Sequence, residues 1–494
     1  MNAAIGRTLG LAATFLAAGC AGLGQPGARS SLRDAGGLAA AGTFAGVPAS
    51  DAAWPADDWW RAFGDPQLDR LMAEALAGSP TLRAAEARTR AALAVADAGK
   101  AALYPQVNGA ASSTRERFAE HGTTPPPVAG TWNTIHQVQA SLSWELDFWG
   151  RNRAAYESAL GAARAAEVDA RAARVALTTG IAQAYARLER AFLQLDVARK
   201  ALDAREHVYA LTRERSAAGI DSRIELRQAE AAIPAARERI ARLEETIALT
   251  RNQIAALMGE GSDRGLAIAR PKADGLATLT LPSTLPAELL GRRPDLVARR
   301  WRVEALRHGI DAAKAAFYPN VNLVGLVGLQ SLGAAGLFTA ASRTLAAGPA
   351  VTLPIFEGGK LRANLAGKRA EYDDAVEQYN QALAEALREV ADQVASFRSV
   401  RSQRTEESRA IGAAREAYEL ALLRYREGVG NYLQVLSAEA PLLEQESLEA
   451  DLRSRELAIS INLVRALGGG FRPESEGLAV ARASQPGAHD HDLP

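Results

Sequence analysis

The sequence predicts a mainly α-helical chain that also supplies strands to a transmembrane β-barrel. Three observations predict this fold class: an internal duplication, a long proline-free helical stretch in each half, and alternating segments before each stretch. Each half should therefore hold a two-stranded β segment followed by a long coiled-coil αα-hairpin. The length of 494 residues, with 48% hydrophobic and 23% charged residues, suffices for this plan and excludes disorder over the whole chain.

The overall composition excludes several classes of function. Lysine and arginine together number 57, as do aspartate and glutamate, so the chain has no net field to hold nucleic acid. Cys20 is the only cysteine, which excludes intrachain disulfides, thiolate metal clusters and cysteine catalysis. The six histidines are scattered, so we expect no metal site and no cofactor apart from a covalent lipid.

The N-terminus predicts export and lipidation. An apolar run of about ten residues, from Leu9 to Ala18, has the length of a signal-peptide core and is too short to span a bilayer. The run ends in small residues followed by Cys20, a pattern that resembles a bacterial lipobox. We expect a lipoprotein signal peptide over residues 1–19 and a lipidated tether, rich in Gly, Ala and Ser, over residues 20–53. The alternative is an ordinary signal peptide with an incidental cysteine.

The chain contains the same plan twice. Residues 98–108 (AGKAALYPQVN) return as residues 312–322 (AAKAAFYPNVN), with eight of eleven positions identical. The tripeptide AEA occurs at residues 229–231 and again at 438–440, a shift of about 209 positions. The expected division is a first repeat over residues 54–265, a second repeat over residues 266–470 and a polar tail over residues 471–494.

A very long helix is predicted in each half. Residues 151–217 are rich in Ala, Arg, Glu and Leu, and as a helix they would extend about 100 Å. Gly219 and Gly428 should end the long helices, because glycine adopts a positive φ at little cost, and a shorter returning helix follows each glycine. The helical hairpins thus cover about residues 151–258 and 359–467, with their tips at the two glycines. Apolar residues at spacings of three and four predict coiled-coil packing: Ile181, Tyr185, Leu188, Phe192 and Leu195, then Leu383, Leu387, Val390, Val394 and Phe397.

Alternating segments precede the long helices. Residues 137–148 place small and polar side chains on one face and apolar side chains on the other, over a length that crosses a membrane as a tilted strand. Two strands are expected in each half, within about residues 104–148 and 318–356. Alternation alone would also suit an ordinary soluble sheet, but an exported chain with four strands and helices of about 100 Å does not assemble a compact soluble domain. Four strands cannot enclose an interior, so other copies must complete the sheet.

Several motifs carry a family resemblance. Residues 291–296 (GRRPDL) precede residues 312–319 (AAKAAFYP), and residues 424–428 (RYREG) precede residues 436–439 (LSAE). Together with the duplication and the lipobox, these motifs resemble the outer-membrane efflux factor family, the TolC-like exit ducts, in its lipoprotein branch of the NodT type. The resemblance implies a homotrimer in the cell outer membrane, with a twelve-stranded barrel in the lipid and a helical tunnel in the periplasm. It also implies two partners, an inner-membrane pump and a periplasmic adaptor (membrane fusion) protein.

The same resemblance implies a gate at the hairpin tips. Glu225 lies six residues beyond Gly219 and is similar in placement to a lumen carboxylate of the family, and Tyr425 is retained. A solvated coiled-coil position is the alternative for this carboxylate. At the matching places of the second half the sequence has three uncharged residues: Gly430, Gln434 and Ser437.

An acidic ring would therefore depend on few carboxylates. Glu225 is the first candidate, and Glu230 and Glu439 are further candidates. We expect a partly charged gate that opens more easily than a fully charged one.

The favoured function is passive export of small toxic compounds or drugs, without enzymatic activity. One alternative is a structural coiled-coil envelope lipoprotein without channel activity, and another is a lipid-anchored hydrolase. Alternation over a membrane-crossing length counts against a mere spacer. The hydrolase is disfavoured because the sequence offers no convergent nucleophile, base and orienting group.

Overall fold

The computed structural model describes residues 30–34, 43, 49–50, 54–272, 281–282 and 291–472. Cys20, the expected signal peptide, most of the expected tether and the tail beyond residue 472 lie outside the described residues. The first half contains η2 (Trp59–Phe63), α3 (Pro66–Gly78), α4 (Pro80–Ala101), β2 (Gln106–Arg117), β3 (Trp132–Glu145), α5 (Arg151–Ala217), α6 (Arg223–Met258) and α7 (Ser262–Leu266). The second half contains α9 (Pro294–Ala315), β5 (Asn320–Leu332), η3 (Ala334–Gly336), η4 (Ala340–Ser342), β6 (Arg343–Thr352), α10 (Lys360–Arg426) and α11 (Tyr432–Ala466).

The order of elements repeats the duplication seen in the sequence. A helix, two strands, a long helix and a returning helix follow one another twice, and α5 and α10 each have 67 residues. The bounds of α5 coincide with the predicted long helix, and α6 and α11 end within one residue of the predicted hairpin ends at residues 258 and 467. The two-residue strands β1 (Ala49–Ser50) and β4 (Leu281–Pro282) pair in parallel.

Two compact units divide the chain, and each takes segments from both halves. The first unit holds Thr89–Ala165 and Arg299–Asn380 with the described residues up to Leu32, and it contains the four long strands. The second unit holds Arg33–Arg88, Ala166–Ala298 and the described residues from Gln381 onward, and it contains both hairpin tips.

The four strands of the first unit form one antiparallel sheet in the order β2-β3-β5-β6. Leu142 in the middle of β3 lies opposite Val107 of β2 and Gly325 of β5, whereas Ser141 lies opposite Asn108 and Leu326. Because successive strand residues point to opposite faces, Ser141 and Leu142 belong to different faces of the sheet. The predicted alternation is therefore present in the register.

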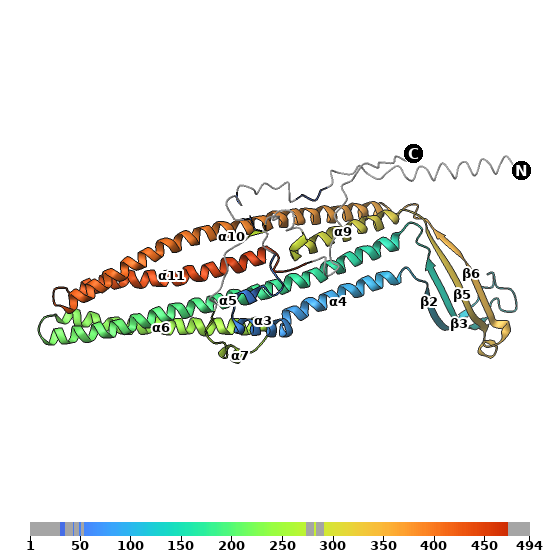
Figure 1. The fold of residues 1–494 in the computed structure, drawn as a ribbon. Helices are drawn as coiled ribbons and strands as arrows, with labels where there is room; N and C mark the ends of the chain where they lie inside the picture. Colours follow the sequence, from blue (N-terminus) through green and yellow to red (C-terminus); the bar gives the residue numbers. More distant parts are fainter. Residues whose placement is uncertain are drawn as a thin grey trace. The chain divides into compact units, whose positions relative to one another are not determined.

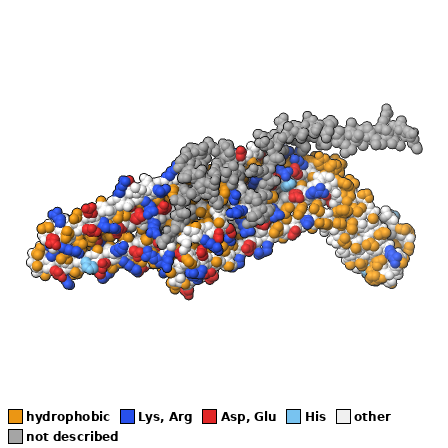
Figure 2. Space-filling view, in the orientation of Figure 1, with side chains coloured by type: hydrophobic (Ala, Val, Ile, Leu, Met, Phe, Trp, Pro, Cys, Tyr) orange, Lys and Arg blue, Asp and Glu red, His pale blue; other side chains and the backbone are white. Residues whose placement is uncertain are grey.

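One face of this sheet is apolar and exposed. The residues that share the face of Leu142 include Val138, Val327 and Leu345, with 40%, 57% and 84% of their surface exposed. Figure 2 shows hydrophobic side chains gathered over the strands, whereas charged side chains spread over the helices. An exposed apolar sheet face of this extent marks a surface that another apolar phase covers.

The second unit is built around two antiparallel helical hairpins. In Figure 1, α5 runs beside α6 and α10 runs beside α11, and a short turn joins each pair. Ion pairs cross both hairpins: Arg199 with Glu244 between α5 and α6, and Arg404 with Glu449 between α10 and α11. No helix among the described residues is both long enough and apolar enough to span a membrane.

The predicted apolar stripes are mostly buried, with Phe192 and Phe397 half-buried. Ile181, Tyr185 and Leu188 are at most 1% exposed, as are Leu383 and Val390. The apolar stripe on α5 packs against η2 and α3 as well as against α6, because its core cluster includes aromatic residues of η2 and apolar residues of α3. Tertiary packing by these short helices thus stabilises the long helix over its buried stretch.

A buried carboxylate, Glu407 of α10, faces α11. Its side chain is 6% exposed, and the Gln445 amide nitrogen, assigned from the hydrogen-bonding pattern, donates to both carboxylate oxygens. Burial, together with the negative charges of Glu449 and Glu444 on α11, raises the pKa of Glu407 above its ordinary value of 4.5. The folded state therefore binds this proton more tightly than the unfolded chain does.

This shift predicts how stability depends on pH. As the pH rises from 4.5 through the raised pKa of Glu407, the unfolded chain releases the Glu407 proton more readily than the folded state does. Ionisation of Glu407 therefore lowers the stability of the folded state at neutral pH. Glu407→Gln should stabilise the protein at pH 7.5, and the gain should shrink as the pH falls toward 4.5. Thermal unfolding between pH 4.5 and pH 7.5 measures this gain in stability. The exposed Glu406→Gln is the control, and an equal gain at every pH for Glu407→Gln would contradict the assignment.

Candidate functional site

The two hairpin tips are short turns with well-defined caps. Gly219 and Gly428 have φ of 72° and 82°, which confirms that glycine conformations end the long helices. Ser222 caps the N-terminus of α6, where its hydroxyl accepts from the Ile224 N–H at 3.1 Å. Asn431 begins α11, where its side-chain oxygen accepts from the Gln434 N–H at 3.0 Å. These caps satisfy amide groups that a helix start leaves unpaired.

Glu225 completes a capping box at the first tip. Its carboxylate accepts from the Ser222 N–H at 2.9 Å and also from the Ser222 hydroxyl. The hydrogen bond from that hydroxyl lowers the pKa of Glu225 below its ordinary value, so the exposed side chain is a carboxylate at neutral pH. The contacts give Glu225 a local role in starting α6. Its expected place in the lumen of an assembled tunnel stays a prediction.

The uncharged candidates of the second tip have backbone roles. The Gly430 N–H donates to the Arg424 carbonyl at 2.9 Å, and a Cβ atom at Gly430 would lie 3.1 Å from the Tyr425 amide nitrogen. The Ser437 hydroxyl donates to the Gln434 carbonyl at 3.0 Å. A charged side chain at position 430 would therefore require the backbone of the turn to shift. For Gly430, Gln434 and Ser437 a role in a gate stays a prediction.

Two further carboxylates that the sequence suggested for an acidic ring are engaged in ion pairs. Glu439 is 7% exposed and accepts from Arg205 at 2.9 Å. Glu230 pairs with Arg227, three residues earlier on the same helix. Within this chain, neither carboxylate is an uncompensated charge.

Tyr425 lies at the centre of a polar cluster that joins the two tips. Its side chain is fully buried, and its hydroxyl donates to Asp221 at 2.5 Å. The Thr212 hydroxyl lies 2.8 Å from the same oxygen. Because Asp221 and Thr212 belong to the first hairpin and Tyr425 to the second, these bonds connect segments more than 200 residues apart in sequence. We call the four residues Thr212, Arg215, Asp221 and Tyr425 the tip latch.

Arg215 supplies the positive charge of the tip latch. Its guanidinium donates to both Asp221 oxygens at 2.9 and 3.2 Å and to the Tyr425 carbonyl at 2.9 Å. The guanidinium carbon also lies 4.5 Å from the centre of the Tyr425 ring. One planar cation thus contacts both hairpins, a geometry that a lysine could not reproduce.

The charges of the tip latch stabilise one another. Burial opposes ionisation of Asp221, but the hydrogen bonds from Arg215 and Tyr425 outweigh it and lower the pKa of Asp221. Burial and the hydrogen bond to Asp221 raise the pKa of Tyr425 to about 12. The latch therefore holds an ionised carboxylate and a neutral phenol at neutral pH.

Sequence reasoning found Tyr425 but missed its partners Thr212, Arg215 and Asp221. The duplication contained a signal that could have indicated these partners. At a shift of 209, Asp221 matches Gly430, Tyr425 matches Ser216 and Thr212 matches Ala421, so these three latch residues are present in one half only, whereas Arg215 matches Arg424. An unmatched acid and an unmatched phenol at duplicated tips indicate a contact between the two halves.

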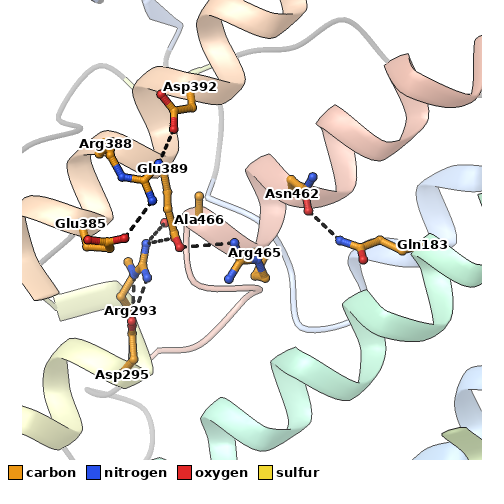
Figure 3. Close-up of polar contacts among 10 residues, drawn as sticks. All are labelled: Gln183, Arg293, Asp295, Glu385, Arg388, Glu389, Asp392, Asn462, Arg465 and Ala466. Atoms are coloured by element: carbon orange, nitrogen blue, oxygen red, sulfur yellow. Dashed lines mark hydrogen bonds and ion pairs between the residues drawn. The ribbon is translucent and has the colours of Figure 1, made fainter. Parts of the chain in front are cut away.

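The GRRPDL motif also forms a cluster, near the N-terminus of α9 (Figure 3). Arg293 is 6% exposed and donates to the Asp295 carboxylate at 3.0 and 2.7 Å. It also donates to Glu389 of α10 at 2.7 Å and to the Ala466 carbonyl at the end of α11 at 3.4 Å. Arg465 donates to the same Glu389 at 3.3 Å. The motif is a structural clamp that ties three helices together.

The four-stranded sheet and the two long helical hairpins are the fold of outer-membrane channels. The chain belongs to the outer membrane efflux protein family, whose model matches residues 71–260 and 285–469. The resemblance to this family is thereby confirmed, whereas the lipoprotein branch stays a prediction, and the protein is an outer-membrane component of an efflux system.

Individual relatives cover most of the chain. The multidrug resistance outer membrane protein MdtP of Escherichia coli K12 is 33% identical over 427 residues, 85% of this chain and 87% of that protein. The fusaric acid resistance protein FusA of Burkholderia cepacia is 41% identical over 367 residues, 73% of this chain and 68% of that protein. The crystal structure of the outer membrane protein VceC of Vibrio cholerae is similar with a TM-score of 0.80 at 36% identity, covering 85% of this chain and 100% of VceC.

Proposed function

We propose that the chain is the passive outer-membrane duct of a tripartite efflux system and works as a homotrimer. The observation that carries this proposal is the four-stranded sheet, whose exposed apolar face suits lipid. Among the described residues, β2 and β6 each pair on one edge only, which leaves two edges for other copies. Three copies would supply twelve strands and close a barrel, the number that the family resemblance implies.

The substrates are small toxic compounds or drugs, and the chain itself performs no chemistry. Relatives named for multidrug resistance and for fusaric acid resistance support this class of cargo. A duct of this kind draws its energy from an inner-membrane pump and receives the cargo through a periplasmic adaptor.

The surface that meets the adaptor is formed by the hairpin tips. Ile220 and Ile224 are 63% and 68% exposed at the first tip, and Val429 and Leu433 are 68% and 63% exposed at the second. These pairs occupy matching positions at a shift of 209, so each tip has two solvent-exposed aliphatic side chains. Exposed aliphatic residues at duplicated ends favour an apolar partner surface. Photocrosslinking from the four positions in cells should capture the adaptor.

Planar-bilayer recording tests the proposed function. The purified protein should give single-channel conductance, which the alternative of a structural coiled-coil lipoprotein would not give. Chemical crosslinking of the same preparation should yield a trimer. A monomer without conductance would refute the proposal.

The tip latch holds the periplasmic end in its resting arrangement. Tyr425→Phe removes a hydrogen bond to a charged group, which is worth about 1.5–3 kcal/mol, so channel openings should become about tenfold more frequent or more. Single-channel recording measures this. Tyr432→Phe is the matched control, because its ring belongs to the same buried cluster. Equal opening frequencies for the two variants would show that the latch does not govern the resting state.

Glu225 contributes a ring of three carboxylates to the narrow end of the trimer. Such a ring concentrates negative potential and favours cations. Glu225→Gln, which keeps the capping geometry, should lower cation selectivity, and Gln434→Asp should raise it. Reversal potentials in a salt gradient measure both, and unchanged potentials in both variants would place these residues outside the lumen.

Cys20 carries the lipid that anchors the mature N-terminus in the outer membrane. The lone cysteine at the end of the signal-like apolar run supports this assignment. Mass spectrometry of the N-terminal peptide tests it, and an unmodified Cys20 in the mature protein would refute it.

A further inference from the structure

Each returning helix contains one proline close to its tip. Pro234 lies eleven residues beyond the first residue of α6, and Pro441 lies nine residues beyond the first residue of α11. The outgoing helices α5 and α10 contain none. A proline inside a helix cannot donate to the carbonyl four residues earlier, and it bends or weakens the helix at that point. Both hairpins thus have a weak step in the returning helix only.

A single side chain of α5 contacts both returning helices at this level. The Arg205 Nε donates to the Glu439 carboxylate of α11 at 2.9 Å, and its Nη1 donates to the Ala232 carbonyl of α6 at 3.3 Å. Ala232 lies two residues before Pro234, and Glu439 lies two residues before Pro441. The ion pair is sheltered, since the Arg205 side chain is 23% exposed and the Glu439 side chain 9%. Arg205 therefore connects a proline-free helix to the same step of both interrupted helices.

Arg205 lines two pockets. A groove of about 550 Å³ is lined by Arg205 and by small residues of α5 and α6, among them Ala201 and Ala235. A smaller pocket, which Arg205 also lines, is lined by Glu439 and Tyr432 and borders the apolar cluster at the tips. The groove is also lined by the charged residues Glu238, Arg239 and Arg242 of α6. The groove thus begins directly after Pro234 in α6.

We propose that Arg205 is a positioning residue of a hinge, and that the segments 223–233 and 432–440 tilt about Pro234 and Pro441 when the tips open. In the resting arrangement Arg205 holds both segments against α5, so it acts on the gate through Glu439 and the Ala232 carbonyl. An arginine is required because two donors on one rigid plane reach two different helices. The expected effect on channel opening rests on the proposed channel function. The tilting of the two segments does not depend on that function.

Channel recording of the full-length protein tests the consequence. Arg205→Gln should raise the frequency of resting openings at least several-fold, and Arg205→Lys should do so too, because it keeps the charge but loses the two-point contact. Arg199→Gln is the matched control, since it removes an exposed ion pair between α5 and Glu244 of α6. The double variant Pro234→Ala, Pro441→Ala restores both backbone donors and should lower opening several-fold below wild type.

A distance measurement tests the hinge without relying on conductance. Spin labels on Ile220→Cys and Val429→Cys should give a broader or longer distance distribution with Arg205→Gln than with Arg199→Gln. The proline double variant should narrow the distribution. Distributions identical to the control in both cases would overturn the hinge even if the channel conducts. Conversely, a wild-type protein that gives no conductance, together with these distance changes, would refute the proposed function but support the hinge.

Discussion

Replacing Arg293 by methionine is expected to lower the free energy of unfolding by about 1.5–3 kcal/mol, because it removes hydrogen bonds to charged groups while Asp295, 43% exposed, keeps access to water. The guanidinium is almost fully buried and binds Asp295, Glu389 and the Ala466 carbonyl, so its removal leaves a carboxylate and a carbonyl without their cation. Glu389 still has Arg465, but that contact is longer, at 3.3 Å. Denaturant unfolding of the detergent-solubilised protein measures the loss.

A neighbouring arginine provides the control for this variant. Arg388 pairs with Glu385 and Asp392 on the same helix (Figure 3), and its side chain is 56% exposed. Exposed pairs of this kind contribute about 0–1 kcal/mol, so Arg388→Met should have a small effect. Equal losses for Arg293→Met and Arg388→Met would mean that the GRRPDL motif does not clamp the three helices.

Leu142→Arg should cost about 2–4 kcal/mol in membrane stability, whereas Ser141→Arg should be tolerated. Leu142 lies on the exposed apolar face of the sheet, opposite Val107 and Gly325, and a charge there would enter the hydrocarbon of the bilayer. Ser141 lies on the other face, which the proposed barrel directs toward water. Folding into lipid vesicles, followed by urea titration, compares the two.

The comparison is informative because the two positions are adjacent in one strand. Any general effect of an added arginine on folding or expression falls on both variants. If both lose stability to the same extent, either the alternation or the lipid environment is wrong for this sheet. If only Ser141→Arg is destabilised, the two faces are reversed.

Local regularities of the sequence were sufficient to predict the long helices, the returning helices, the turns between them and the four long strands. A stretch without proline predicted α5 with its observed bounds, and glycines predicted the two tip turns. Alternation predicted the strand face that carries Leu142, which the register confirms. Each of these signals depends on residues that are close in sequence, because helix propensity, turn conformation and strand periodicity are local properties.

The candidate site was only partly predictable, because its contacts join distant segments. Tyr425 was found from a motif, but its partner Asp221 lies 204 residues away and belongs to the other hairpin. Arg293 was recognised as part of a motif, yet only the structure shows that it binds Glu389, 96 residues later.

The sequence by itself determined the duplicated plan, the lengths of the helices, the turns at their tips and the apolar face of the strands. Only the tertiary structure decided which charged side chains are buried and paired: Arg215 with Asp221, Arg293 with Glu389 and Arg205 with Glu439. The physical reason is that the chain contains 57 basic and 57 acidic residues, nearly all compatible with a solvated helix surface. The contribution of one such charge to the free energy of unfolding depends on whether packing buries it next to an opposite charge.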